Sequence, residues 1–131
     1  MPAMMMAHED DPRDDILAKV GNLDNVEVFH NQILVATYVR PKKTKSGIYL
    51  SDQTVKEDEY QGKVGLVLKV GPQAFVSDDK SDFHGLEVAP GDWIFYRPSD
   101  GWPTTVNGVP CRMFDNEYLI RGRVSSPDAV W

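Results

Sequence analysis

Several things are scarce in this chain of 131 residues. Cys111 is the single cysteine, so no disulfide can form within the chain, and a reducing, cytoplasmic compartment fits best. No apolar run approaches the length that crosses a bilayer, and the first residues lack the basic and apolar segments of a secretory signal. Lys and Arg number 14 against 20 Asp and Glu. This acidic balance disfavours a general binder of nucleic acid or of anionic membranes.

Patterns that carry chemistry are scarce as well. His8, His30 and His84 are far apart in the sequence, and Cys111 has no partner signature around it. The Asp and Glu residues show no metal-ligand spacing. We therefore expect no enzyme activity, no metal and no cofactor.

What the chain does have is a series of short strand patterns between Gly and Pro turns. β-branched and aromatic residues dominate these patterns, and Asn107-Gly108 is a dipeptide typical of a tight hairpin. The expected strands cover 26–30, 32–39, 63–72, 93–96, 104–106, 109–113 and 117–124. Short strands joined in this way predict an all-β fold, either a barrel or a sandwich.

The first residues differ from this pattern. Residues 1–25 hold six acidic side chains, and residues 1–10 are expected to be disordered. Asp11 followed by proline predicts a helix start, an apolar stripe follows, and Gly21 predicts the helix end. No further helix is predicted. An acidic extension over 1–25 therefore precedes a β domain over 26–131.

Residues 40–62 form the most distinctive segment, which is long, polar and charged. Its middle carries one apolar tripeptide, Ile48-Tyr49-Leu50, directly after Gly47. A segment this polar cannot offset the entropy of ordering itself, whereas three apolar side chains in its middle predict an anchor for another surface. The alternative is an edge strand packed on its own domain.

Five motifs in this order resemble the GroES-type co-chaperonin family, and the resemblance covers residues 26–126. The first is His30 followed by the strand QILV, and the second is the apolar tripeptide after a polar, glycine-containing lead. The motifs, in order, are His30 with 32–35, Thr44 to Leu50, Gly65 to Gly71, Val88-Ala89-Pro90-Gly91-Asp92 and Asp115 to Ile120. Their order makes the combination more specific than any one motif.

The resemblance implies a small GroES-like β-barrel with a long mobile loop over about 40–62. Such subunits form a homo-oligomeric ring, a heptamer in the family, and cap a large GroEL-type ring chaperonin whose ATP cycle assists protein folding. By position, Ile48, Tyr49 and Leu50 would dock on that partner. Lys45, Ser46 and Gly47 would form the flank of the loop.

Two other functions stay open. The extension over 1–25, the longer loop and Tyr49 in the anchor depart from ordinary members, as in a virus-encoded or otherwise diverged protein. Such a chain is alternatively a structural, decorating (cement) protein of a virion, with capsid shell proteins as its partners. The basic RPKKTK run beside exposed aromatic residues also suits single-stranded nucleic acid, but the acidic total disfavours it.

Overall fold

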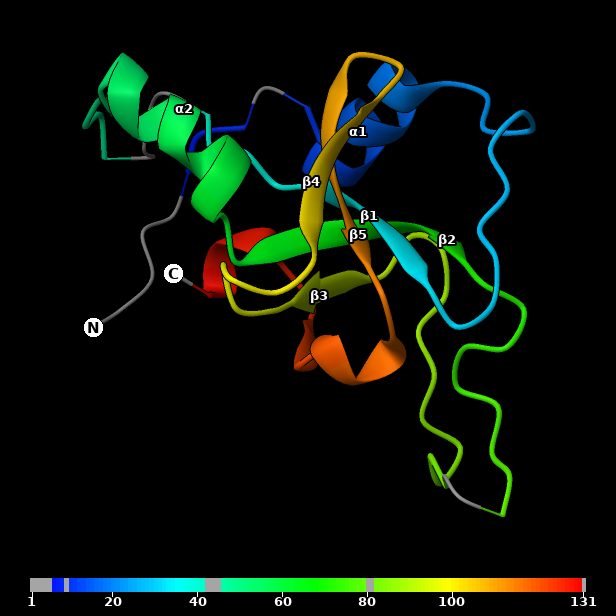
Figure 1. Ribbon diagram of the computed structural model, residues 1–131. Coiled ribbons are helices and arrows are strands. Elements are labelled where there is room, and N and C mark those ends of the chain that lie inside the picture. Colours follow the sequence, from blue (N-terminus) through cyan, green and yellow to red (C-terminus); the bar gives the residue numbers. More distant parts are fainter. Residues whose placement is uncertain (1–5, 9, 42–45, 80–81, 131) are drawn as a thin grey trace.

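Six short strands form one sheet in the computed structural model, which describes residues 6–8, 10–41, 46–79 and 82–130. The strands are β1 (Ile33–Thr37), β2 (Val64–Val70), β3 (Trp93–Phe95), β4 (Trp102–Val106), β5 (Val109–Phe114) and β6 (Gly122–Val124). Their order in the sheet is β4-β5-β1-β2-β3-β6, and each neighbouring pair is antiparallel. The sheet twists strongly, so that β4 and β5 run steeply across β2 and β3 (Figure 1). This mostly β architecture agrees with the predicted fold class.

The central strand β1 is buried along its whole length. Because side chains alternate between the two faces of a strand, its residues enter two different cores. Leu34 and Ala36 belong to one core cluster, and Ile33 and Val35 belong to the other. The sheet is therefore covered on both faces at this point.

The predicted N-terminal helix is present as α1 (Pro12–Val20). The Asp11 carboxylate caps it by accepting hydrogen bonds from two first-turn amides at 2.9 and 3.2 Å. Gly21 ends the helix with φ at +67°. Ile16 and Val20 are buried in the same core cluster as Leu34. The helix of the extension thus packs on the sheet.

The predicted hairpin is also present, between β4 and β5. Asn107 and Gly108 both have positive φ, 50° and 80°, and Val106 pairs with Val109 across the turn. The Asn107 side chain also donates a hydrogen bond of 2.7 Å to the Val20 carbonyl at the end of α1. This contact joins the hairpin tip to the helix beside it (Figure 1).

One expected strand is absent, and another is shortened. Residues 26–30 form no strand, because the chain turns before and after them, and His30 takes a left-handed φ of 58°. The expected long strand over 117–124 begins instead with a 3-10 turn, η1 (Glu117–Leu119). Asn116 starts this turn by accepting a hydrogen bond from the Tyr118 amide at 3.0 Å. Only β6 remains extended.

A second helix, α2 (Asp52–Gln61), was not predicted. Ser51 caps its start, since its hydroxyl oxygen accepts a hydrogen bond from the Thr54 amide at 3.1 Å. The helix consists of residues with ordinary or good helix propensity but lacks an apolar stripe, so hydrophobic periodicity gives no sign of it.

Residues 1–10 are only partly described, since 1–5 and 9 lie outside the described residues. Met6 contradicts the expectation of disorder, because its side chain is fully buried. Among the described residues, no helix has both the length and the apolar character needed to cross a membrane.

Candidate partner-binding loop

Loop 40–62 leaves the sheet between two neighbouring antiparallel strands. The last paired residues of β1 and β2 are Thr37 and Gly65, and the Tyr38 amide then donates a hydrogen bond of 2.9 Å to the Val64 carbonyl. A Cβ on Gly65 would lie only 2.8 Å from the Ala36 carbonyl oxygen, so the backbones approach closely here. Both ends of the loop are therefore held at one root on the sheet.

The anchor tripeptide, Ile48-Tyr49-Leu50, presents two exposed apolar side chains. Ile48 is 59% exposed and Tyr49 is 70% exposed, whereas Leu50 is half-buried. Tyr49 also forms an isolated β-bridge, so its backbone is ordered while its ring lies in solvent. This arrangement leaves apolar area of Ile48 and Tyr49 open to another surface.

The flank of the loop is described in part. Gly47 has a φ of +92°, and a Cβ there would meet nothing within 4 Å, so the glycine serves the turn before Ile48 and no close contact. Ser46 belongs to the same turn. Lys45 lies outside the described residues. The partner-binding role of all six predicted residues, 45–50, stays a prediction.

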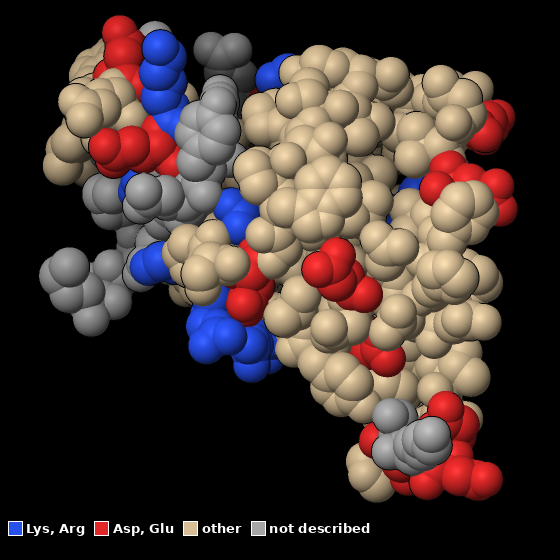
Figure 2. All heavy atoms as spheres, viewed as in Figure 1, with Lys and Arg blue, Asp and Glu red and all other residues tan. Residues whose placement is uncertain are grey.

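Helix α2 follows the anchor tripeptide and stands away from the sheet (Figure 1). The space-filling view has Asp, Glu, Lys and Arg atoms gathered over this helix, whereas uncharged atoms dominate the face over β4 and β5 (Figure 2). The charged helix and the exposed anchor therefore form one projecting unit attached at the loop root.

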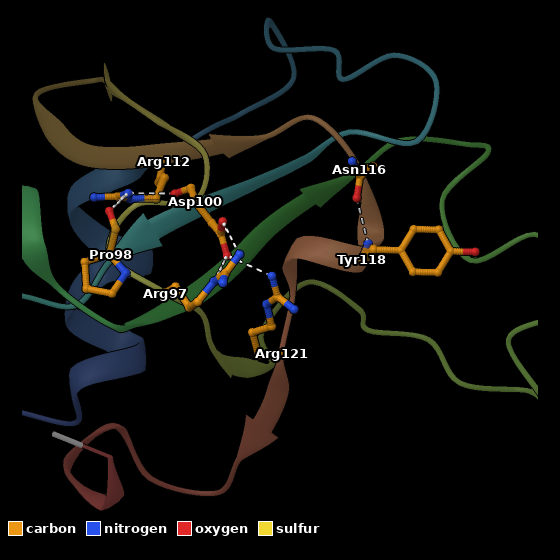
Figure 3. A network of polar contacts seen from close by, with 7 residues as sticks. All are labelled: Arg97, Pro98, Asp100, Arg112, Asn116, Tyr118 and Arg121. Atoms are coloured by element: carbon orange, nitrogen blue, oxygen red, sulfur yellow. Dashed lines mark hydrogen bonds and ion pairs between the residues drawn. The ribbon is translucent and has the colours of Figure 1, made fainter.

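A buried arginine organises a polar network elsewhere in the fold (Figure 3). Arg112 on β5 donates through Nη1 to the carbonyl oxygens of Pro98 and Asp100, both at 2.7 Å. The Asp100 carboxylate accepts from Arg97 at 3.1 Å and from Arg121 at 3.4 Å. The hydrogen bond from Arg97, followed by the nearby positive charges, lowers the pKa of Asp100 below its ordinary value of 3.8.

This network holds the turn between β3 and β4 and joins it to the segment before β6. Sequence reasoning missed it, although an arginine inside the apolar strand VPCRMF is a visible signal, because a buried arginine requires acceptors. The groups of this network bond to one another inside the fold, so we infer that the network stabilises the fold.

Two of the histidines and the single cysteine lie apart from one another in the described part of the chain. His30 and His84 are exposed on separate turns. Cys111 is buried, and burial raises the pKa of its thiol to about 11, which keeps it protonated and unreactive. No group of three or more His, Cys, Asp or Glu that could hold a metal occurs among the described residues. The expectation of no metal and no cofactor remains a prediction.

Comparisons with known proteins agree on one family. The family model described as chaperonin 10 Kd subunit matches residues 25–121. A co-chaperonin GroES of Leptothrix cholodnii is 33% identical over 91 residues, which cover 70% of this chain and 88% of that protein. A co-chaperonin GroES of a Caulobacter species is 37% identical over 78 residues, or 60% of this chain and 75% of the relative. A co-chaperonin GroES of Rickettsia conorii is 31% identical over 80 residues, or 61% and 78%.

These relatives support a co-chaperonin function, and nothing in them supports the viral alternative. The matched range contains β1, loop 40–62 and β2, but neither α1 nor the last described residues. The chain belongs to the chaperonin 10 family, the co-chaperonins.

Proposed function

We propose that this co-chaperonin assembles as a homo-oligomeric ring and caps a large GroEL-type chaperonin, with the anchor tripeptide as its docking element. The observation that carries the proposal is the exposure of Ile48 and Tyr49 on a loop that projects from the sheet. The protein would act without a catalytic group or cofactor of its own, and its partner would supply the ATP cycle.

The energetics suit a reversible cap. Burying an apolar side chain completely contributes about 1.5–3 kcal/mol, and the loop must lose conformational freedom when it docks. Each subunit alone would therefore bind weakly. A ring presents several anchors to one partner, so the second and later contacts form at a high effective concentration and the cap as a whole holds.

Ile48→Ser tests the anchor directly. The matched control is Val76→Ser, because Val76 is a β-branched residue with 55% exposure, close to the 59% of Ile48, but lies on a different loop. Both variants should fold with the melting temperature of the parent chain, since neither side chain is buried.

The measurement is co-sedimentation with a purified large chaperonin in the presence of ADP, with electron microscopy of the particle ends. We expect the parent chain and Val76→Ser to cap the particles and Ile48→Ser to lose capping. If the parent chain sediments without the chaperonin, or if Ile48→Ser caps as well as Val76→Ser, the proposed docking is wrong. Sedimentation of the free protein tests the ring separately, because a monomer would contradict it.

A further inference from the structure

Residues 6–8 of the N-terminal extension lie beside the C-terminal end of the described chain. We call these residues the strap. Met6 is fully buried and forms an isolated β-bridge, and its amide donates a hydrogen bond of 3.3 Å to Asp128 Oδ2. Asp128 lies in η2 (Pro127–Ala129) and is only 3% exposed. The strap thus joins the first described residues to a segment near the end of the described chain.

A buried carboxylate holds the strap through several donors. His8 Nε2 lies 3.1 Å from Asp128 Oδ2 and 3.1 Å from the Tyr38 hydroxyl oxygen. The Tyr38 hydroxyl donates to Asp128 Oδ1 at 2.5 Å. An ionised carboxylate only accepts hydrogen bonds, so the His8 tautomer with its proton on Nε2 would donate to Asp128. Hydrogen bonds to a charged group are stronger than neutral ones, and a buried carboxylate requires them.

Tyr38 connects this cluster to loop 40–62. It directly follows β1, and its amide donates to the Val64 carbonyl at the loop root. Its ring packs edge-on against Trp93 of β3, with 5.7 Å between the ring centroids, and lies 5.9 Å from the His8 ring. The residue that the strap contacts is therefore the one from which the loop departs.

The strap also lies outside the range that the family model matches. The family match covers residues 25–121, so His8 and Asp128 both lie outside it, whereas Tyr38 lies inside. Two segments from outside the matched range thus meet on one side chain at the root of the matched loop.

We propose that the strap positions the root of loop 40–62, with His8 and Asp128 as positioning residues that act through Tyr38. By restricting the root, the strap lowers the ordering cost of docking and raises the affinity of the anchor tripeptide for its partner. The effect on affinity rests on the proposed co-chaperonin function, whereas the effect on the loop root does not.

The test uses the full chain with two single variants, His8→Ala and Tyr38→Phe. Tyr38→Phe removes only the hydroxyl group and keeps the ring that packs on Trp93. The control is Asp10→Asn, which changes an exposed residue of the same extension. Hydrogen–deuterium exchange is followed separately in residues 6–8, in 38–41 with 46–51, and in β1 and β2.

We expect both variants to speed exchange in residues 6–8 and at the loop root by about tenfold, as for the loss of one hydrogen bond to a charged group. Exchange in the middle of β1 and β2 should stay as in Asp10→Asn. The apparent Kd for a large chaperonin should rise about threefold to tenfold, following the freer root.

Three results would contradict the proposed role of the strap. Faster exchange in residues 6–8 with an unchanged loop root would mean that the strap does not reach the loop. An equal rise of the exchange rate throughout β1 and β2 would mean that the cluster of His8, Tyr38 and Asp128 only stabilises the fold. Unchanged affinity with a freed root would remove its role in docking. If the parent chain itself fails to bind a chaperonin, the proposed function falls, while the exchange data still decide whether the strap restrains the root.

Discussion

Replacing Gly65 with alanine tests how tightly the root of loop 40–62 is packed. An added Cβ would lie 2.2 Å from Val35 Cγ1 and 2.8 Å from the Ala36 carbonyl oxygen. Both distances are below 3.0 Å, a separation that real Cβ atoms essentially never show. The valine side chain is buried and the second contact is with backbone, so neither neighbour can easily move away.

Two opposite effects determine the size of the change. Alanine in place of a strand glycine gains about 0.5–1 kcal/mol, because the unfolded chain loses less freedom on folding. Overpacking a well-filled site costs about 1–3 kcal/mol. The contacts are severe enough for overpacking to win, so we expect Gly65→Ala to lower the free energy of unfolding by about 1–2 kcal/mol.

Urea denaturation gives the assay, with the slope m unchanged and the midpoint lowered. Adding Val35→Ala removes one of the two clashing atoms, so the double variant should be more stable than the sum of the single effects by about 0.5 kcal/mol or more. Gly85→Ala is the control, because its φ is +80° and a Cβ there meets nothing within 4 Å. That control should show backbone strain but no coupling to Val35. A Gly65→Ala protein as stable as the parent would refute the close packing of the root.

The other predictions concern titration. Because the pKa of Asp100 is lowered in the folded state, its contribution is present above its ordinary value of 3.8 and is lost as the pH falls through the lower folded value. Asp100→Asn should therefore be less stable than the parent at pH 7, with a gap in the urea midpoint that closes below about pH 4; a gap that stays constant would contradict this. Burial raises the pKa of Tyr96 from 10.0 to about 12 and that of Cys111 from 9.0 to about 11. The unfolded chain releases these protons first, so stability should fall from pH 9 toward 12, and less steeply in Tyr96→Phe and Cys111→Ala; equal slopes in thermal melts would contradict the assignment.

The parts of the fold that could be predicted are those with local chemical causes. Asp11 with its following proline specifies the start of α1, and Asn107-Gly108 specifies a turn with two positive φ values. The position of the anchor tripeptide could also be predicted, since three apolar residues within a polar segment are recognisable without any tertiary information.

The parts that could not be predicted depend on competing or distant partners. The Asn116 side chain accepts a hydrogen bond from the Tyr118 amide, and a 3-10 turn forms where a strand was expected. His8 and Asp128 lie 120 residues apart, so no local pattern links them. The sequence holds 20 acidic residues and three histidines, and only the folded chain determines which of them meet.

Helix α2 lies within loop 40–62, so its stability bears on the proposed docking of that loop. It spans 10 residues and projects from the sheet, as seen in Figure 1. Isolated helices shorter than about 12–15 residues are marginal in water, because nucleation is costly and few hydrogen bonds follow it. The free energy that holds α2 as a helix is therefore small, and burying Ile48 and Tyr49 on the proposed partner would offset its loss. The proposed docking is thus compatible with the loss of α2, provided that the root of the loop stays fixed on the sheet.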